Sequence, residues 1–128
     1  MKKAFTSLFF LLILFVSCNM PKPDKAIAMM NRYWEFYKVE NIDSLKTFYT
    51  GSIPDTSFWS SLHAVGEKYG DIKNVSLTNT TVGQSLGEGE RIELTYEVEY
   101  DKKTLDHEFS FKKDANGEYK ISKHELTK

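Results

Sequence analysis

The segment from Arg91 to Asp101 constrains the fold of this chain more than any other part of the sequence. Apolar side chains alternate there with charged or polar ones, the apolar positions being Ile92, Leu94, Tyr96, Val98 and Tyr100. Successive side chains of a strand point to opposite faces, so a period of two predicts an antiparallel strand with one buried face and one wet face.

Further strands are predicted on both sides of this one. After a tight turn over 101–104, the apolar set continues at Leu105, Phe109 and Phe111. A hairpin connection over 114–117, in which Asn116-Gly117 is expected to supply the positive-φ positions, leads to a last strand that begins at Tyr119. A first strand over 72–82 alternates less regularly, and a flexible loop over 83–89 is expected to join it to the second.

Before Gly70 the apolar residues recur at helical spacing, which predicts three helices. The first begins at Pro23-Asp24, with Asp24 as the expected cap, and its apolar face includes Ile27, Met30, Trp34 and Tyr37. Asn41 is expected to cap a short second helix that ends at Gly51. Pro54-Asp55 begins a third helix, which ends at Gly70.

The order of elements predicts an α+β fold, with three N-terminal helices packed on one face of a curved four-stranded antiparallel meander sheet. Over 24–126 this order resembles the cystatin-like roll of the nuclear transport factor two-like and SnoaL-like proteins. The segment Gly117-Glu118-Tyr119-Lys120-Ile121 resembles the ending of many small secreted members, which commonly have Trp where this chain has Tyr119. The resemblance implies a long first helix across the sheet and a cone-shaped pocket between them.

Residues 1–18 have the pattern of a secretory signal. Lys2 and Lys3 precede an apolar run over 8–16, which is shorter than the roughly 20 residues that a spanning helix needs. Phe15-Val16-Ser17-Cys18 resembles the bacterial lipoprotein box, with Phe15 where Leu is usual. The resemblance implies cleavage before Cys18, a diacylglycerol on its thiol, and an acyl chain such as palmitate on the new amino group. A cleaved secretory peptide with Cys18 as a free thiol and an uncleaved short anchor are the alternatives.

The expected organisation is therefore a signal peptide over 1–17, a lipidated Cys18 with a tether over 18–23, and a single domain over 24–128. This places the protein on the extracytoplasmic side of a bacterial cell envelope, held to a membrane by lipid. Removing residues 1–17 takes away Lys2 and Lys3 and moves the formal charge from −1 to −3. Weak acidity argues against a nucleic-acid partner.

Neither a metal nor another cofactor is expected. Cys18 is the only cysteine, so the chain cannot form an internal disulfide. His63, His107 and His124 do not have the spacing of a metal site.

His107 is the candidate catalytic residue, because alternation places it on the same face as Leu105, Phe109 and Phe111. A histidine in a pocket can act as a general acid or base near neutral pH. The alternative is a histidine that is hydrogen-bonded at the rim of the sheet. The adjacent Asp106 is expected to point to the opposite face, so no Asp–His pair is predicted. The candidate ligand-binding residues, which are otherwise core, are Trp34, Tyr37, Trp59, Tyr96 and Tyr100.

Three functions remain open from the sequence. The first is a membrane-anchored lipoprotein with a non-catalytic domain that binds a small molecule or an envelope protein. The second is a small SnoaL-like enzyme that uses His107. The third is an envelope interaction or inhibitor protein that uses the acidic face formed by Glu93, Glu97, Glu99 and Asp101, which is otherwise an ordinary solvated surface.

Overall fold

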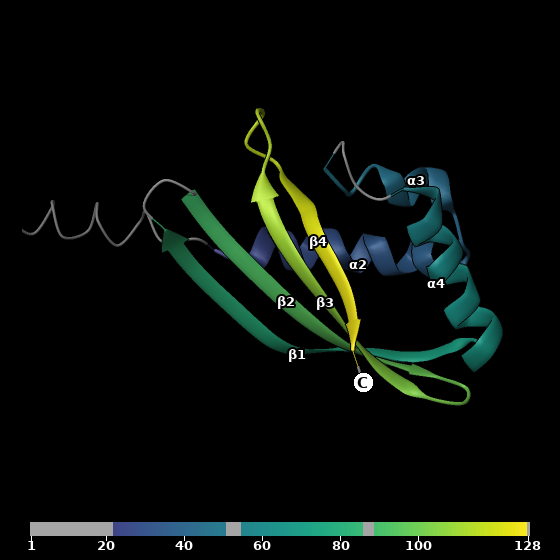
Figure 1. The fold of residues 1–128 in the computed structure, drawn as a ribbon. Helices are drawn as coiled ribbons and strands as arrows, with labels where there is room; N and C mark the ends of the chain where they lie inside the picture. Colours follow the sequence, from purple (N-terminus) through teal and green to yellow (C-terminus); the bar gives the residue numbers. More distant parts are fainter. Residues whose placement is uncertain (1–21, 51–54, 86–88, 128) are drawn as a thin grey trace, which may run out of the picture.

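The computed structural model describes residues 22–50, 55–85 and 89–127, so Cys18 and the signal peptide expected over 1–17 lie outside the described residues. Figure 1 shows helices α2 (Asp24–Lys38), α3 (Ile42–Lys46) and α4 (Thr56–Tyr69), followed by strands β1 (Ile72–Ser85), β2 (Gly89–Tyr100), β3 (Thr104–Lys113) and β4 (Tyr119–Thr127). The strands form one antiparallel sheet in the order β1-β2-β3-β4. The predicted α+β order and the meander are confirmed.

The alternation that predicted β2 is confirmed residue by residue. Ile92, Leu94 and Val98 are completely buried, whereas Arg91 and Glu97 are exposed. The buried side chains lie opposite apolar partners on β3, with Leu94 beside Phe109 and Val98 beside Leu105. Such cross-strand apolar pairs are the unit that stabilises an antiparallel sheet.

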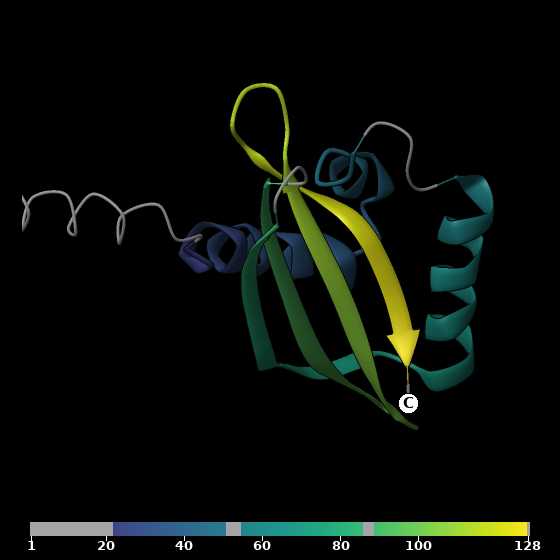
Figure 2. The ribbon, with the colours of Figure 1, turned by 60° about the vertical axis from the view of Figure 1, so that its left-hand side comes forward.

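Aromatic side chains connect α2 to the buried face of the sheet. The ring of Trp34 lies 5.5 Å from that of Tyr96 on β2, and the ring of Tyr33 lies 5.4 Å from that of Phe109 on β3. Both pairs meet edge to face, which is a favourable geometry for aromatic rings. In Figures 1 and 2, α2 crosses behind the strands, and α3 and α4 lie near the C-terminal end of α2.

Two helix boundaries differ from the prediction. Asp24 does not cap α2: Pro23 occupies the cap position with helical dihedral angles, and its carbonyl already accepts a hydrogen bond from the Ile27 N–H. Proline has φ preset near the helical value, so the helix begins one residue early. The second helix ends at Lys46 rather than near Gly51, because the following residues leave it to pair with Ile121, whose N–H donates to the Phe48 carbonyl at 2.7 Å.

Two connections between strands also differ. β1 continues to Ser85, where a loop was expected from residue 83, since Gly83 pairs with Arg91. In the β3–β4 connection, Gly117 has a positive φ but Asn116 does not. The Asp114 carboxylate shapes this turn instead, by accepting hydrogen bonds from the N–H groups of Asn116 and Glu118. Because this loop is longer than a two-residue hairpin turn, it needs only one left-handed residue.

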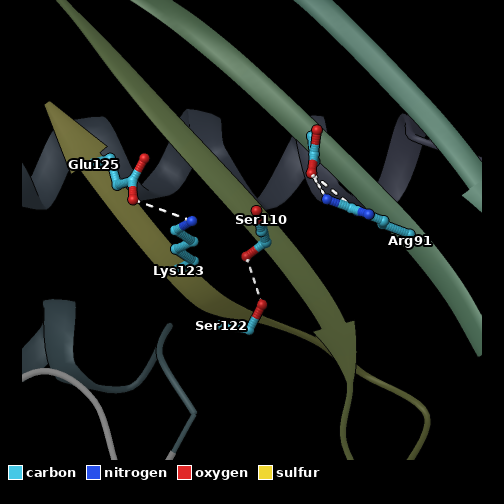
Figure 3. Close-up of polar contacts among 6 residues, drawn as sticks. Arg91, Ser110, Ser122, Lys123 and Glu125 are labelled. Atoms are coloured by element: carbon cyan, nitrogen blue, oxygen red, sulfur yellow. Dashed lines mark hydrogen bonds and ion pairs between the residues drawn. The ribbon is translucent and has the colours of Figure 1, made fainter. Parts of the chain in front are cut away.

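A β-bulge at Ser122 reverses the alternation of β4. Phe111 pairs with Ile121, but Ser110 pairs with Lys123, so Ser122 is an extra residue. Figure 3 shows the Ser122 hydroxyl donating to the Ser110 carbonyl at 3.2 Å, and the Lys123–Glu125 ion pair nearby. The bulge therefore turns His124 toward the buried face, where its ring lies 4.1 Å from that of Phe109.

Tyr96 provides a test of this core. Its side chain is 4% exposed, and its hydroxyl has no hydrogen-bond partner among the described residues. We expect Tyr96→Phe to raise the free energy of unfolding by about 1 kcal/mol, because an unpaired buried hydroxyl costs roughly 1–3 kcal/mol. Tyr96→Ala should lower it by about 3–5 kcal/mol. Urea unfolding measures both changes.

The exposed neighbour Glu97 gives the matched control, since Glu97→Ala should stay within about 0.5 kcal/mol of the parent protein. A clear loss of stability in Tyr96→Phe would mean that the hydroxyl has a partner in solution.

Candidate functional site

A cleft of about 530 Å³ lies between the C-terminal end of α2, α3, α4 and the start of β1. Its apolar wall is formed by Ile42, Leu45, Trp59, Leu62 and Ile72, and two phenols, Tyr37 and Tyr100, complete it. A volume of this size is in the usual range of small-molecule sites, which are mostly apolar with a few polar groups.

Glu40 lies at one edge of the cleft, where it ends α2 in a left-handed conformation. Its φ of 53° lies in the left-handed region, which costs a residue with a side chain on the order of 1 kcal/mol. Its carboxylate lies 3.1 Å from Nδ1 of His63, and Nε2 of the same ring lies 3.5 Å from Glu67. These contacts connect the end of α2 to α4. The conformation is that of a helix C-cap, because the N–H groups of Glu40 and Asn41 donate to the carbonyls of Tyr37 and Phe36, as in a Schellman motif.

Gly70 closes the opposite edge, where α4 turns into β1. Its φ is 91°, and a Cβ atom would lie 2.5 Å from Oδ2 of Asp101. That carboxylate oxygen accepts a hydrogen bond from the Asp71 N–H at 2.9 Å. The predicted helix end at Gly70 is thus confirmed, and only glycine fits there without displacing Asp101.

The positive and negative charges of the side chains that line the cleft nearly cancel. Lys38 and Lys46 carry positive charge, and Glu40, Glu67 and Asp71 carry negative charge. The cleft therefore has no strong preference for an anion or a cation.

Trp59 lines the cleft, and its indole nitrogen is buried without a hydrogen-bond partner among the described residues. The residue as a whole is 7% exposed. An indole N–H can donate but never accept.

A continuous hydrogen-bonded network leads from the cleft into the core. We name it the Tyr–His network, and its members, in order, are Tyr37, Tyr100, His107, His124, Tyr49 and Tyr33. The donor–acceptor distances along this order are 3.3, 2.9, 2.9, 3.0 and 2.7 Å. The network thus joins α2, β2, β3, β4 and the segment after α3.

Every member of the network is uncharged at neutral pH. Burial lowers the pKa of His107 to about 3, and burial together with neighbouring His107 lowers the pKa of His124. Burial raises the pKa of Tyr33, Tyr37 and Tyr49 above the usual phenol value. A neutral imidazole donates through one nitrogen and accepts through the other, so the network has a direction.

His107 lies on the buried face of β3, as predicted, and is completely buried in the middle of the strand rather than at the rim. Its two hydrogen-bond partners are Tyr100 and His124. Asp106 pairs with Glu97 on the other face, as predicted. Since Tyr100 lines the cleft and His107 does not, the histidine reaches the cleft only through that phenol.

The aromatic candidates divide into two groups. Tyr37, Trp59 and Tyr100 line the cleft, whereas Trp34 and Tyr96 pack against each other in the core.

Sequence reasoning missed Tyr33, Tyr49 and His124 as members of one site. The sequence contained a signal for His124 in the spacing from Ile121 to Leu126. These two apolar residues lie an odd number of positions apart, so both can face inward only if the strand contains a bulge between them.

The acidic face keeps its predicted position on the wet side of the sheet. Glu97 lies opposite Asp106, and Glu108 lies opposite Glu125, so like charges face each other across neighbouring strands. Figure 3 shows Arg91 on this side, with its Nε 2.9 Å from Oε1 of Glu93. A role of this face in binding stays a prediction.

Within residues 22–50, 55–85 and 89–127, no group of three or more His, Cys, Asp or Glu side chains is placed to hold a metal ion. None of the helices described is both long and apolar enough to cross a membrane. A comparison with models of known protein families finds no match, and neither does a comparison with curated protein sequences.

The low pKa of His107 predicts that the folded protein becomes less stable at acidic pH. A folded-state pKa near 3, below the 6.5 of a free histidine, means that the unfolded chain binds the proton first. The free energy of unfolding should therefore fall as pH decreases below about 6.5, with about 1 kcal/mol lost to His107 by pH 5.5. His124 acts in the same direction.

The test is urea unfolding at pH 7.5 and 5.5. His107→Gln should reduce the difference between the two pH values, whereas Tyr100→Phe, which breaks the same hydrogen bond without removing the imidazole, should not. An unchanged difference in His107→Gln would contradict the prediction.

Proposed function

We propose that this chain is a bacterial cell-envelope lipoprotein, attached to a membrane through lipid on Cys18. The support is the sequence over 1–18, in which Lys2 and Lys3, a short apolar run and Ser17-Cys18 follow one another. Two or more acyl chains give stable membrane attachment, whereas one gives only marginal attachment. The domain beyond the tether then acts at the membrane surface.

We further propose that the domain is a cystatin-like roll with the helices packed on one face of the sheet. The aromatic contacts of Tyr33 and Trp34 with β2 and β3 support this arrangement. A roll of this kind serves many functions, so the function has to be argued from the site.

The function that we propose for the domain is non-catalytic binding of a small molecule in the cleft. The observation that carries it is the cleft itself, with an apolar wall that includes Leu45, Trp59 and Leu62.

The geometry supports catalysis less well. His107 is buried, and its hydrogen-bond partners are a phenol and a second imidazole rather than a carboxylate. An imidazole with a pKa near 3 is a weak base at neutral pH. Binding therefore remains the better-supported function for this cleft.

The anchor is tested by Cys18→Ala. Without the thiol no diacylglycerol can attach, so we expect the protein to move from the membrane fraction to the soluble fraction. Cell fractionation with immunoblotting measures this change, with Ser17→Ala, which keeps a small residue before the cysteine, as the control. Continued membrane association of the Cys18→Ala protein would refute the lipid anchor.

Gly66 allows the cleft to be filled without disturbing the fold. This glycine lines the cleft within α4, and a Cβ atom there would meet only Glu40, at an ordinary 3.7 Å. We expect Gly66→Met to block the site, and Gly66→Ala to leave it open while keeping or improving helix stability.

Native mass spectrometry of the full lipoprotein, extracted from its host membrane, provides the readout. A bound small molecule should appear with the parent protein and with Gly66→Ala, and should be lost with Gly66→Met. Equal retention by Gly66→Met would place the ligand elsewhere.

A further inference from the structure

The Tyr–His network carries one more proton than it has hydrogen bonds. Its four phenols and two neutral imidazoles each have one O–H or N–H, whereas the distances define five hydrogen bonds. Among the described residues, one donor is therefore unused. An imidazole cannot be the unused donor, because both ring nitrogens of His107 and of His124 are engaged, and the protonated nitrogen must donate. The unused donor is a tyrosine O–H.

The surroundings of the four tyrosines decide which one it is. Tyr33 is completely buried and Tyr49 is 5% exposed, and among the described residues neither hydroxyl has a partner outside the network. An unpaired donor at such a position reduces the population of that arrangement by about five- to a hundredfold. Tyr37 and Tyr100 line the cleft instead, and Tyr37 is the more exposed of the two.

We infer that this choice orients the whole network toward the cleft, with the following order of donors. Tyr33 donates to Tyr49, and Tyr49 donates to Nδ1 of His124. Nε2–H of His124 donates to Nδ1 of His107. In turn, Nε2–H of His107 donates to Tyr100, and Tyr100 donates to Tyr37. The two histidines are thus positioning residues, which direct a free phenol O–H into the cleft.

We propose that the cleft binds an uncharged molecule with an apolar body and a carbonyl-type oxygen, which accepts a hydrogen bond from Tyr37. This inference rests on the proposed binding function. The apolar side chains of Leu45 and Leu62 suit the body of the molecule, and the near balance of lysines and carboxylates favours an uncharged one.

The orientation of the network has a direct signature. Both His107 and His124 should be Nε2–H tautomers, whereas the opposite orientation requires Nδ1–H in both rings. We suggest measuring ring ¹⁵N chemical shifts by long-range ¹H–¹⁵N NMR on the mature lipoprotein in detergent micelles at pH 7. An Nδ1–H tautomer in either ring would overturn the proposed orientation.

The ligand class is tested with acetophenone and ethylbenzene, which share a skeleton but differ by the carbonyl oxygen. Binding is followed through the Trp59 indole N–H resonance of the same protein. We expect Tyr37→Phe to weaken acetophenone binding by about fivefold, the effect of one net hydrogen bond, and to leave ethylbenzene binding unchanged. Comparing each probe between variants cancels its partitioning into micelles.

Tyr96→Phe is the matched control, because it removes a buried hydroxyl that belongs neither to the network nor to the cleft. If Tyr100 replaces the lost donor in Tyr37→Phe, the double variant Tyr37→Phe with Tyr100→Phe should show the fivefold loss. Equal effects of the double variant on both probes would overturn the ligand class while leaving cleft binding intact. No response of Trp59 to either probe would reject the proposed binding function itself, and the tautomers would still report the orientation.

Discussion

The hydrogen bond between His107 and His124 is the interaction on which the interior of this domain depends. It joins β3 to β4 through side chains, at 2.9 Å, inside a core that is otherwise aromatic and aliphatic. Neither imidazole can be protonated there without a large penalty, so each must find both a donor and an acceptor. Tyr100 on one side and Tyr49 on the other meet that need. The position of the segment after α3 follows from the same requirement, because it carries Tyr49.

A polar network whose buried members are all paired favours a single arrangement of a small domain, which apolar packing alone does not. Apolar side chains can repack with little loss, whereas a buried hydrogen-bonded network has few satisfied arrangements. Here the network runs through α2, three strands and the segment after α3, so one wrong contact leaves a buried donor or acceptor unpaired. We infer that it selects one arrangement of helices against sheet, as polar groups in other cores are thought to do.

The parts of the fold that the sequence predicted correctly are those governed by local periodicity. The alternation of Ile92, Leu94 and Val98 is visible without any tertiary contact, and so is the glycine that ends α4. The parts that it did not predict depend on partners distant in the chain. The short α3 ends early because Phe48 pairs with Ile121, and β1 extends because Gly83 finds Arg91. Tertiary pairing of this kind overrides local preference.

The candidate site shows the same division. Tyr37, Trp59 and Tyr100 could be selected from their aromatic character, but nothing local distinguishes them from Trp34 and Tyr96, which share the same periodic pattern and lie in the core. His107 could be placed on the buried face by counting along its strand. His124 could not, because the bulge at Ser122 changes the phase between Ile121 and the end of β4.

The bulge therefore links the backbone to the chemistry of the cleft. Without the extra residue at Ser122, Lys123 would face Phe109 and His124 would face solvent. His107 would then lose its partner at Nδ1, and the order of donors that ends at Tyr37 could not form. A single inserted residue in β4, far from the cleft along the chain, thus determines whether the phenol at the cleft is free to donate. Bulges are often retained for such reasons, since they redirect a side chain that the regular strand would expose.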